Sequence, residues 1–153
     1  MPTKPKKKVA PKSAKKSANA VKSKAPAKLT TTIAPWLCLR GGARAVEFYK
    51  KAFGAVEVFR LDGGGSVVAK LSIDGAEFWL SDESPEHHNH SPESLGGITT
   101  RIIFTVADPD AVFARAVAAG AKEIFPVSDE HGWRIGRVVD PFGHHWEIGR
   151  PLT

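Results

Sequence analysis

An internal repeat places the strongest restriction on the fold of this chain. Residues 45–59 are echoed by residues 111–125, and Gly54 corresponds to Gly120 at a constant offset of 66 residues (120 minus 54). Each stretch predicts a helix that ends at a glycine suited to the left-handed C′ position and then continues into a short strand. The chain is therefore expected to contain the same supersecondary unit twice.

Two more strand-like runs follow each predicted helix. Their ranges are residues 66–73 and 76–81 in the first copy, and 133–139 and 144–149 in the second. The Asp74-Gly75 pair and the Asp140 to Gly143 segment have the composition of the turns that join such strands. With an apolar strand before each helix, both copies become βαβββ units. The sequence predicts an α+β fold in which the two units form a curved mixed sheet around a pocket.

The first 30 residues differ in composition from the rest. Residues 1–29 contain ten lysines, no acidic residue and no aromatic residue, so they cannot build a hydrophobic core. We expect a disordered Lys/Ala/Pro-rich tail over residues 1–30. One domain is expected over residues 31–153, made of repeats at about 32–82 and 98–150.

The charge of the chain is concentrated in this tail. Removing its ten lysines from the 22 basic residues leaves 12 basic against 16 acidic residues, so the body carries −4 although the chain carries +6. Residues 1–29 are predicted either to attract nucleic acid or another polyanion by charge alone or to act as a solubilising extension. Nothing in the tail indicates base recognition.

Composition also restricts where in the cell the protein can be located. No apolar run approaches the roughly 18–20 residues of a membrane span, so no membrane partner is expected. The single cysteine, Cys38, excludes an internal disulfide. A cytoplasmic location is predicted.

The motif Asp-Pro-Phe-Gly-His-His-Trp-Glu-Ile at residues 140–148, together with residues 44–55, 80–83 and 131–136, resembles the vicinal-oxygen-chelate superfamily. This is the glyoxalase, bleomycin-resistance and dioxygenase superfamily, and the likeness is to its PhnB-like branch. The resemblance spans about residues 32–151. It implies a small-molecule pocket used for lyase or isomerase chemistry on an oxygen-bearing substrate, or for dioxygenase-related chemistry. Alternatively, the protein binds or sequesters a small molecule such as a drug without catalysis.

The resemblance also implies four metal-ligand positions, one each on the first, fourth, fifth and eighth strands. They fall on Ala34 or Pro35, Trp79, Arg101 and Glu147. Only Glu147 has a side chain that can ligate a metal, because the indole nitrogen of Trp79 is a donor only. No cofactor is therefore expected, and a divalent metal at Glu147 is the alternative.

An ion pair between Arg101 and Glu147 in place of that metal is predicted, because a carboxylate in a pocket needs charge compensation. In an enzyme, Glu147 would act as the base and Arg101 would stabilise an oxyanion. His145, on the same strand face as Glu147, is the third candidate catalytic residue.

Four further residues are predicted to bind the ligand. Strand alternation places Glu77 and Trp79 on the pocket-facing side of their strand. Trp133 and Arg134 open a strand beside the pocket mouth, where they would bind a planar or anionic ligand or pack at the strand edge. The strand edges of each half need partners, so a homodimer is expected.

Overall fold

The computed structural model describes residues 2–3 and 28–153, and it separates into two compact units, Met1–Thr31 and Thr32–Thr153. The predicted disorder of the tail and its predicted polyanion contacts fall almost wholly outside the described residues. All that follows concerns Thr32–Thr153. Among the described residues, no helix has the length and apolar character needed to cross a membrane.

The first half contains a four-stranded sheet and one long helix. Its elements are β1 (Trp36–Leu39), α1 (Gly42–Phe53), β2 (Val56–Gly63), β3 (Ser66–Ile73) and β4 (Ala76–Asp82). The strand order is β1-β4-β3-β2, with β1 parallel to β4 and the other pairs antiparallel. The helix α1 ends at Gly54, whose φ of 69° is the left-handed conformation that glycine adopts without strain.

The second half repeats this arrangement. Its elements are β5 (Arg101–Thr105), α3 (Pro109–Ala119), β6 (Lys122–Glu130), β7 (Trp133–Val139) and β8 (His145–Pro151). The order β5-β8-β7-β6 matches the first sheet strand for strand. The helix α3 begins after Asp108, whose carboxylate accepts a hydrogen bond from the backbone N–H of Ala111. The predicted α+β class with two βαβββ units is confirmed.

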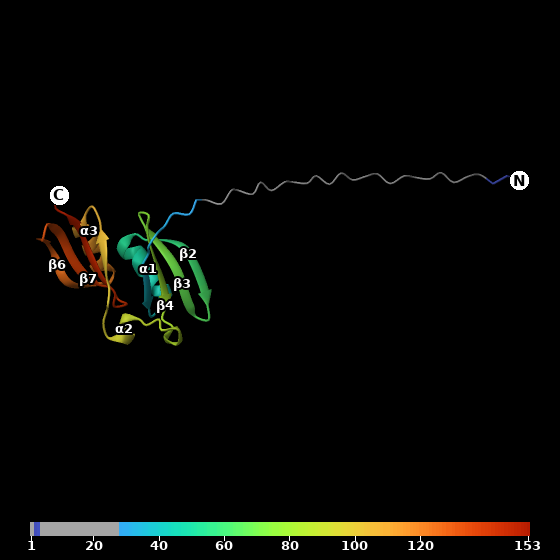
Figure 1. Cartoon of the computed structure of the whole chain (residues 1–153), viewed down its shortest axis with the longest axis horizontal. Helices are drawn as coiled ribbons and strands as arrows, with labels where there is room; N and C mark the ends of the chain where they lie inside the picture. The colour runs from blue at the N-terminus through green and yellow to red at the C-terminus, as the bar shows by residue number, and fades with distance from the viewer. Residues whose placement is uncertain (1, 4–27) are drawn as a thin grey trace. The chain divides into compact units, whose positions relative to one another are not determined.

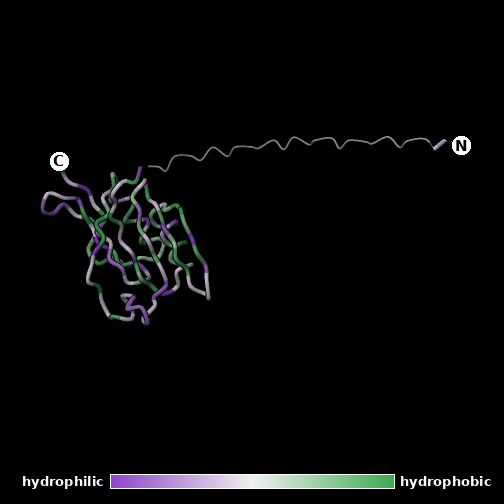
Figure 2. Tube along the Cα trace, turned by 45° about the vertical axis from the view of Figure 1, so that its right-hand side comes forward, coloured by the Kyte–Doolittle hydropathy of each residue, from purple (hydrophilic) through white to green (hydrophobic). Residues whose placement is uncertain are grey.

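The segment between the halves contains two short helices, η1 (Pro85–His87) and α2 (Pro92–Leu95). It is largely hydrophilic and lies at the lower end of the molecule in Figure 2. The carboxylate of Glu83 accepts hydrogen bonds from Arg40 Nε, Ser94 Oγ and the Ser91 backbone N–H, and these bonds lower the pKa of Glu83. They tie the segment to the end of β4.

The helix α1 lies between the two sheets (Figure 1). The ring of Tyr49 packs against Phe78 of β4 and Trp146 of β8, which also contact each other. The buried carboxylate of Asp140 accepts hydrogen bonds from Tyr49 Oη at 2.6 Å and Trp146 Nε1 at 2.9 Å. One aromatic and polar centre therefore joins the halves.

The predicted alternation of buried and open faces is confirmed. Four residues assigned from the sequence to the helix-covered face are buried: Phe78, Leu80, Trp146 and Ile148. Among residues 28–153, no helix covers the opposite face of either sheet, and these faces carry large exposed rings, such as Trp36 at 53% and Phe125 at 55% exposure. Because helices separate the sheets, the two open faces point away from each other.

Candidate functional site

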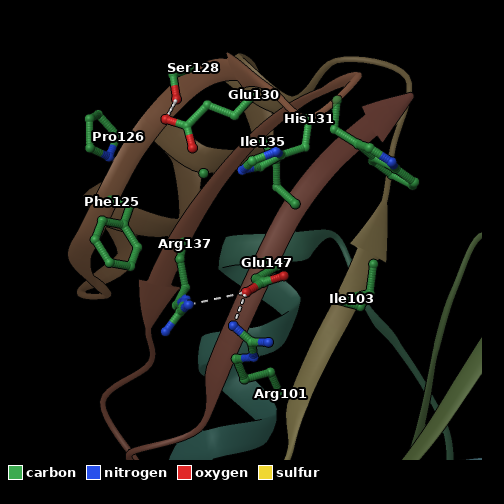
Figure 3. A pocket seen from close by; sticks show the side chains of 12 residues that line it. Arg101, Ile103, Phe125, Pro126, Ser128, Glu130, His131, Ile135, Arg137 and Glu147 are labelled. Carbon is green, nitrogen blue, oxygen red and sulfur yellow. Dashed lines mark hydrogen bonds and ion pairs between the residues drawn. The ribbon is translucent and has the colours of Figure 1, made fainter. Parts of the chain in front are cut away.

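A cavity of about 780 Å³ lies on the open face of the second sheet. Its apolar wall is formed by Ile103, Phe125, Pro126, Trp133 and Ile135. At one end are Arg101, Arg137 and Glu147, and at the other are Ser128, Glu130 and His131 (Figure 3). The strands β5, β6, β7 and β8 thus all contribute to one concave, mainly apolar surface with polar ends, the usual character of a small-molecule site.

The predicted ion pair between Arg101 and Glu147 is present. Arg101 Nη1 lies 2.7 Å from Glu147 Oε1, and Arg137 Nη2 lies 3.3 Å from the same oxygen (Figure 3). The side chain of Glu147 is only 16% exposed, whereas that of Arg101 is 50% exposed. Two guanidinium groups therefore compensate one largely buried carboxylate, which we call the Arg–Glu–Arg cluster.

Arg137 is a residue of the cavity that was not predicted from the sequence. Its position on β7 is directly opposite Glu147 in the antiparallel ladder, so both side chains leave the sheet on the same face. The guanidinium carbon lies 5.0 Å from the centroid of the Phe125 ring, a cation–π contact. The strand alternation that located Glu147 could have located Arg137 too, but only together with the register between β7 and β8.

The imidazole of His145 does not line this cavity. His145 lies opposite Arg101 in the parallel pair of β5 and β8, and its Nδ1 is buried without a hydrogen-bond partner among the described residues. Burial, followed by the charge of Arg137, lowers the pKa of His145. Its place beside the cluster therefore favours the neutral form of the ring.

The structure separates two residues predicted to share the pocket mouth. Trp133 lines the cavity, but Arg134 points to the helix-covered face of β7. There its guanidinium contacts Asp110 of α3 and Asp129 of β6, and the contact with Asp110 lowers the pKa of that carboxyl. Successive side chains of a strand point to opposite faces, so Arg134 cannot share the cavity with Trp133. Arg134 therefore packs at the strand edge, the second of the two roles predicted for it.

Trp79 and Glu77 lie on the open face of the other sheet and are not among the residues that line the cavity. The Trp79 ring stacks on Trp36, with centroids 5.4 Å apart and planes at 10°. Lys70 pairs with Glu77 and lies 5.6 Å from the centroid of Trp79. One chain therefore does not bring Trp79 and Glu147 together as the sequence analysis expected.

The donor set around Glu147 does not fit a divalent metal. Such an ion needs several oxygen, nitrogen or sulfur ligands that carry lone pairs, yet the groups nearest Glu147 are guanidinium donors with none. No cluster of three or more His, Cys, Asp or Glu side chains suited to a metal occurs in the part of the chain that the structure describes.

Residues 37–148 match the model of the Glyoxalase/Bleomycin resistance protein/Dioxygenase superfamily. An uncharacterised protein of Mycobacterium bovis is 42% identical over 126 residues, covering 78% of this chain and 83% of that protein. An uncharacterised protein of Arabidopsis thaliana is 34% identical over 125 residues, covering 71% of each chain.

Solved structures share the fold. TioX from Micromonospora sp. ML1 superimposes with a TM-score of 0.63 at 30% identity, covering 80% of this chain and all of that one. The fosfomycin resistance protein FosX from Listeria monocytogenes, in complex with Mn(II) and sulfate, has a TM-score of 0.60 at 15% identity, covering 80% and 93%. From the family match and the 42% identity to the mycobacterial relative, the chain belongs to the Glyoxalase/Bleomycin resistance protein/Dioxygenase superfamily.

Proposed function

We propose that this protein binds a small molecule in the cavity on its second sheet, with Arg101 balancing the charge of Glu147 in place of a metal ion. The observation that carries the proposal is the 2.7 Å contact between Arg101 Nη1 and Glu147 Oε1 at one end of the cavity. A largely buried carboxylate without a cation would be strongly destabilising. The guanidinium supplies that charge and leaves the apolar wall free for a ligand.

A catalytic role is the second candidate. Both ion-pair contacts of Glu147 use Oε1, so among the described residues Oε2 has no partner that would block a substrate. In lyase or isomerase chemistry, Glu147 Oε2 would accept the substrate proton and Arg101 would stabilise the oxyanion that forms. His145, outside the cavity lining, could act only if the site rearranged.

A homodimer is the arrangement that would reunite the predicted ligand residues. The open faces of the two sheets point away from each other, so Trp79 can reach Glu147 only in a second copy. A two-fold pair would lay the Trp36–Trp79 stack of one copy over the cavity of the other, and would cover the exposed rings of both faces. We propose this pairing, in which Trp79 closes the site.

Three narrower assignments remain predictions: the PhnB-like branch, the cytoplasmic location, and polyanion binding through residues 1–29. The last is tested by comparing DNA retention of the full chain with that of a chain beginning at Thr30. Equal retention of both would contradict a role for the tail.

A metal titration tests the main proposal. Protein dialysed against a chelator should take up no stoichiometric Mn²⁺, and its melting temperature should not rise when Mn²⁺ is added. Small molecules that raise the melting temperature should lose that effect in Arg101→Gln but keep it in Arg150→Gln, an exposed control outside the cavity. One Mn²⁺ per chain, lost in Glu147→Gln, would overturn the proposal.

A further inference from the structure

The Arg–Glu–Arg cluster carries one positive charge in excess. Arg101 and Arg137 contribute two charges, and Glu147 cancels one. His145 adds none at neutral pH, because burial lowers its pKa. The other acidic residue of the cavity, Glu130, lies at the far end, opposite Trp133 in the ladder of β6 and β7. Trp133 and Arg137 are four residues apart on β7, roughly 13 Å along the strand.

The two guanidinium groups also have unused hydrogen-bond donors. Each carries five N–H donors, but both groups reach Glu147 through a single nitrogen, and both contact the same oxygen. Arg137 contacts Glu147 through Nη2 alone, so among the described residues its Nη1 is left to hold an additional acceptor from the cavity that Arg137 lines. Its Nε is buried and has no hydrogen-bond partner among those residues, although buried donors are normally paired.

The position of Arg137 is well defined. Its guanidinium lies over the ring of Phe125 and is opposite Glu147 in the ladder. A guanidinium held in one plane can present a pair of parallel N–H groups, which matches the two oxygens of a carboxylate.

The surface of the cavity away from the Arg–Glu–Arg cluster indicates the chemical character of the rest of the ligand. Between the charged ends lie the side chains of Ile103 and Ile135, and Trp133 lies at the far end opposite Glu130. These side chains favour a flat apolar body. A doubly charged phosphate would exceed the single surplus charge. It would also find no helix N-terminus here, because the cluster stands on strands whose backbone groups are paired with each other.

Resting on the proposed function, we infer that the ligand of this cavity is a monocarboxylate with an apolar, ring-sized body. Its carboxylate is held by Arg137 and Arg101 beside Glu147, and its body lies along Ile135 towards Trp133. Arg137 is the residue that selects the carboxylate.

The test uses three probes with one skeleton and different charge: 2-naphthoate, 2-naphthamide and 2-naphthylmethylammonium. Binding to the full-length protein is followed by ¹H–¹⁵N NMR at the Trp133 indole and the Arg137 Nε–H. The Trp133 signal reports occupation of the cavity by any probe, whereas the Arg137 signal reports capture of the acceptor.

We expect the carboxylate to bind at least about tenfold more tightly than the amide and to move both signals. The ammonium should bind most weakly, and added salt should narrow the difference between the carboxylate and the amide. Arg137→Gln should reduce carboxylate affinity to that of the amide, and Arg137→Lys should retain part of the preference. Arg150→Gln should behave like the wild type, and the NMR spectra show directly whether each variant is folded.

Equal affinity for the carboxylate and the amide, or tightest binding of the ammonium, would overturn the inference while leaving a small-molecule site in place. A Trp133 signal that none of the three probes moves would count against both the inference and the proposed function.

Discussion

The open faces of the two sheets are built to the same plan and carry different chemistry. A row of four side chains crosses each face in register. In the first sheet the row is Phe59, Lys70, Trp79 and Trp36, and in the second it is Phe125, Arg137, Glu147 and Ile103. The aromatic residue and the cation are kept, whereas the third position changes from indole to carboxylate and the fourth from the indole of Trp36 to the aliphatic side chain of Ile103.

This change decides what each face can do. In the first sheet, Lys70 is neutralised by Glu77 and the remaining surface is stacked indole. In the second sheet, one carboxylate is shared by two guanidinium groups, and a cavity opens beside them. The same scaffold therefore presents an apolar surface suited to covering a partner and a charged cavity suited to a ligand. Four measurements, taken in order of decreasing effect, test this contrast and the junction that joins the two halves.

A substitution at the junction between the halves should cause the largest loss of stability. Asp140→Asn removes the charge that accepts hydrogen bonds from Tyr49 and Trp146 in a buried site. We expect a loss of about 3 kcal/mol in the free energy of unfolding, measured by urea denaturation. Asp74→Asn, the same change in the exposed turn of the first half, should cost less than about 0.5 kcal/mol. Equal losses would show that Asp140 does not join the halves.

The first face should mediate self-association. Trp36→Glu places a charge on the exposed stack and should weaken dimerisation by about 100-fold, measured by analytical ultracentrifugation. Val117→Glu adds the same charge at an exposed position of the helix α3 and should leave the dissociation constant unchanged. A monomeric wild type, or a dimer insensitive to Trp36→Glu, would contradict the proposed pairing.

Alkaline pH should weaken the junction. Burial, foremost, and the neighbouring Asp140 raise the pKa of Tyr49 well above 10. Because the pKa of Tyr49 is higher in the folded state than the unfolded value of about 10, its contribution to the free energy of unfolding is fully present below pH 10. Above pH 10 this contribution is lost by up to about 1.4 kcal/mol per pH unit. The phenolate absorbance of Tyr49, the chain's single tyrosine, should therefore appear together with unfolding.

Tyr49→Phe is the control for this titration. It removes the phenol, so the steep loss of stability above pH 10 should disappear. Phenolate absorbance that rises at the ordinary tyrosine pKa while the protein remains folded would contradict the buried environment of Tyr49.

The smallest expected effect is the difference in coupling energy between the two ion pairs, Arg101–Glu147 and Lys70–Glu77. A double-mutant cycle on Arg101 and Glu147 should give a coupling energy of about 1 kcal/mol, reduced by the exposure of Arg101. The cycle on Lys70 and Glu77 should give about 0.5 kcal/mol or less, since both side chains are partly exposed. A stronger coupling in the first sheet would reverse the contrast between the faces.

Much of the fold could be predicted because its signals are local. The glycine that ends each helix, the Asp108 cap and the alternation along β4 and β8 each depend on a few neighbouring residues. The contact between Glu147 and Arg101 was predicted from the family resemblance, which placed both residues at metal-ligand positions of one pocket, and alternation agreed by placing Glu147 on the pocket face. Arg137 was missed because its place opposite Glu147 depends on the register of β7 and β8, which no local pattern specifies. Arg134 is adjacent to Trp133, so alternation alone could have placed it on the other face of the strand.

Patterns in the sequence were enough to predict the two βαβββ units and the buried face of each sheet, and the family resemblance added the ion pair between Arg101 and Glu147. Three features came from the tertiary packing alone: the open faces point away from each other, Trp79 and Glu147 are apart in one chain, and Arg137 shares the carboxylate. Periodicity and turn chemistry act over a few residues, whereas the packing of α1 between the sheets depends on contacts between residues far apart in the chain, such as Tyr49 and Asp140.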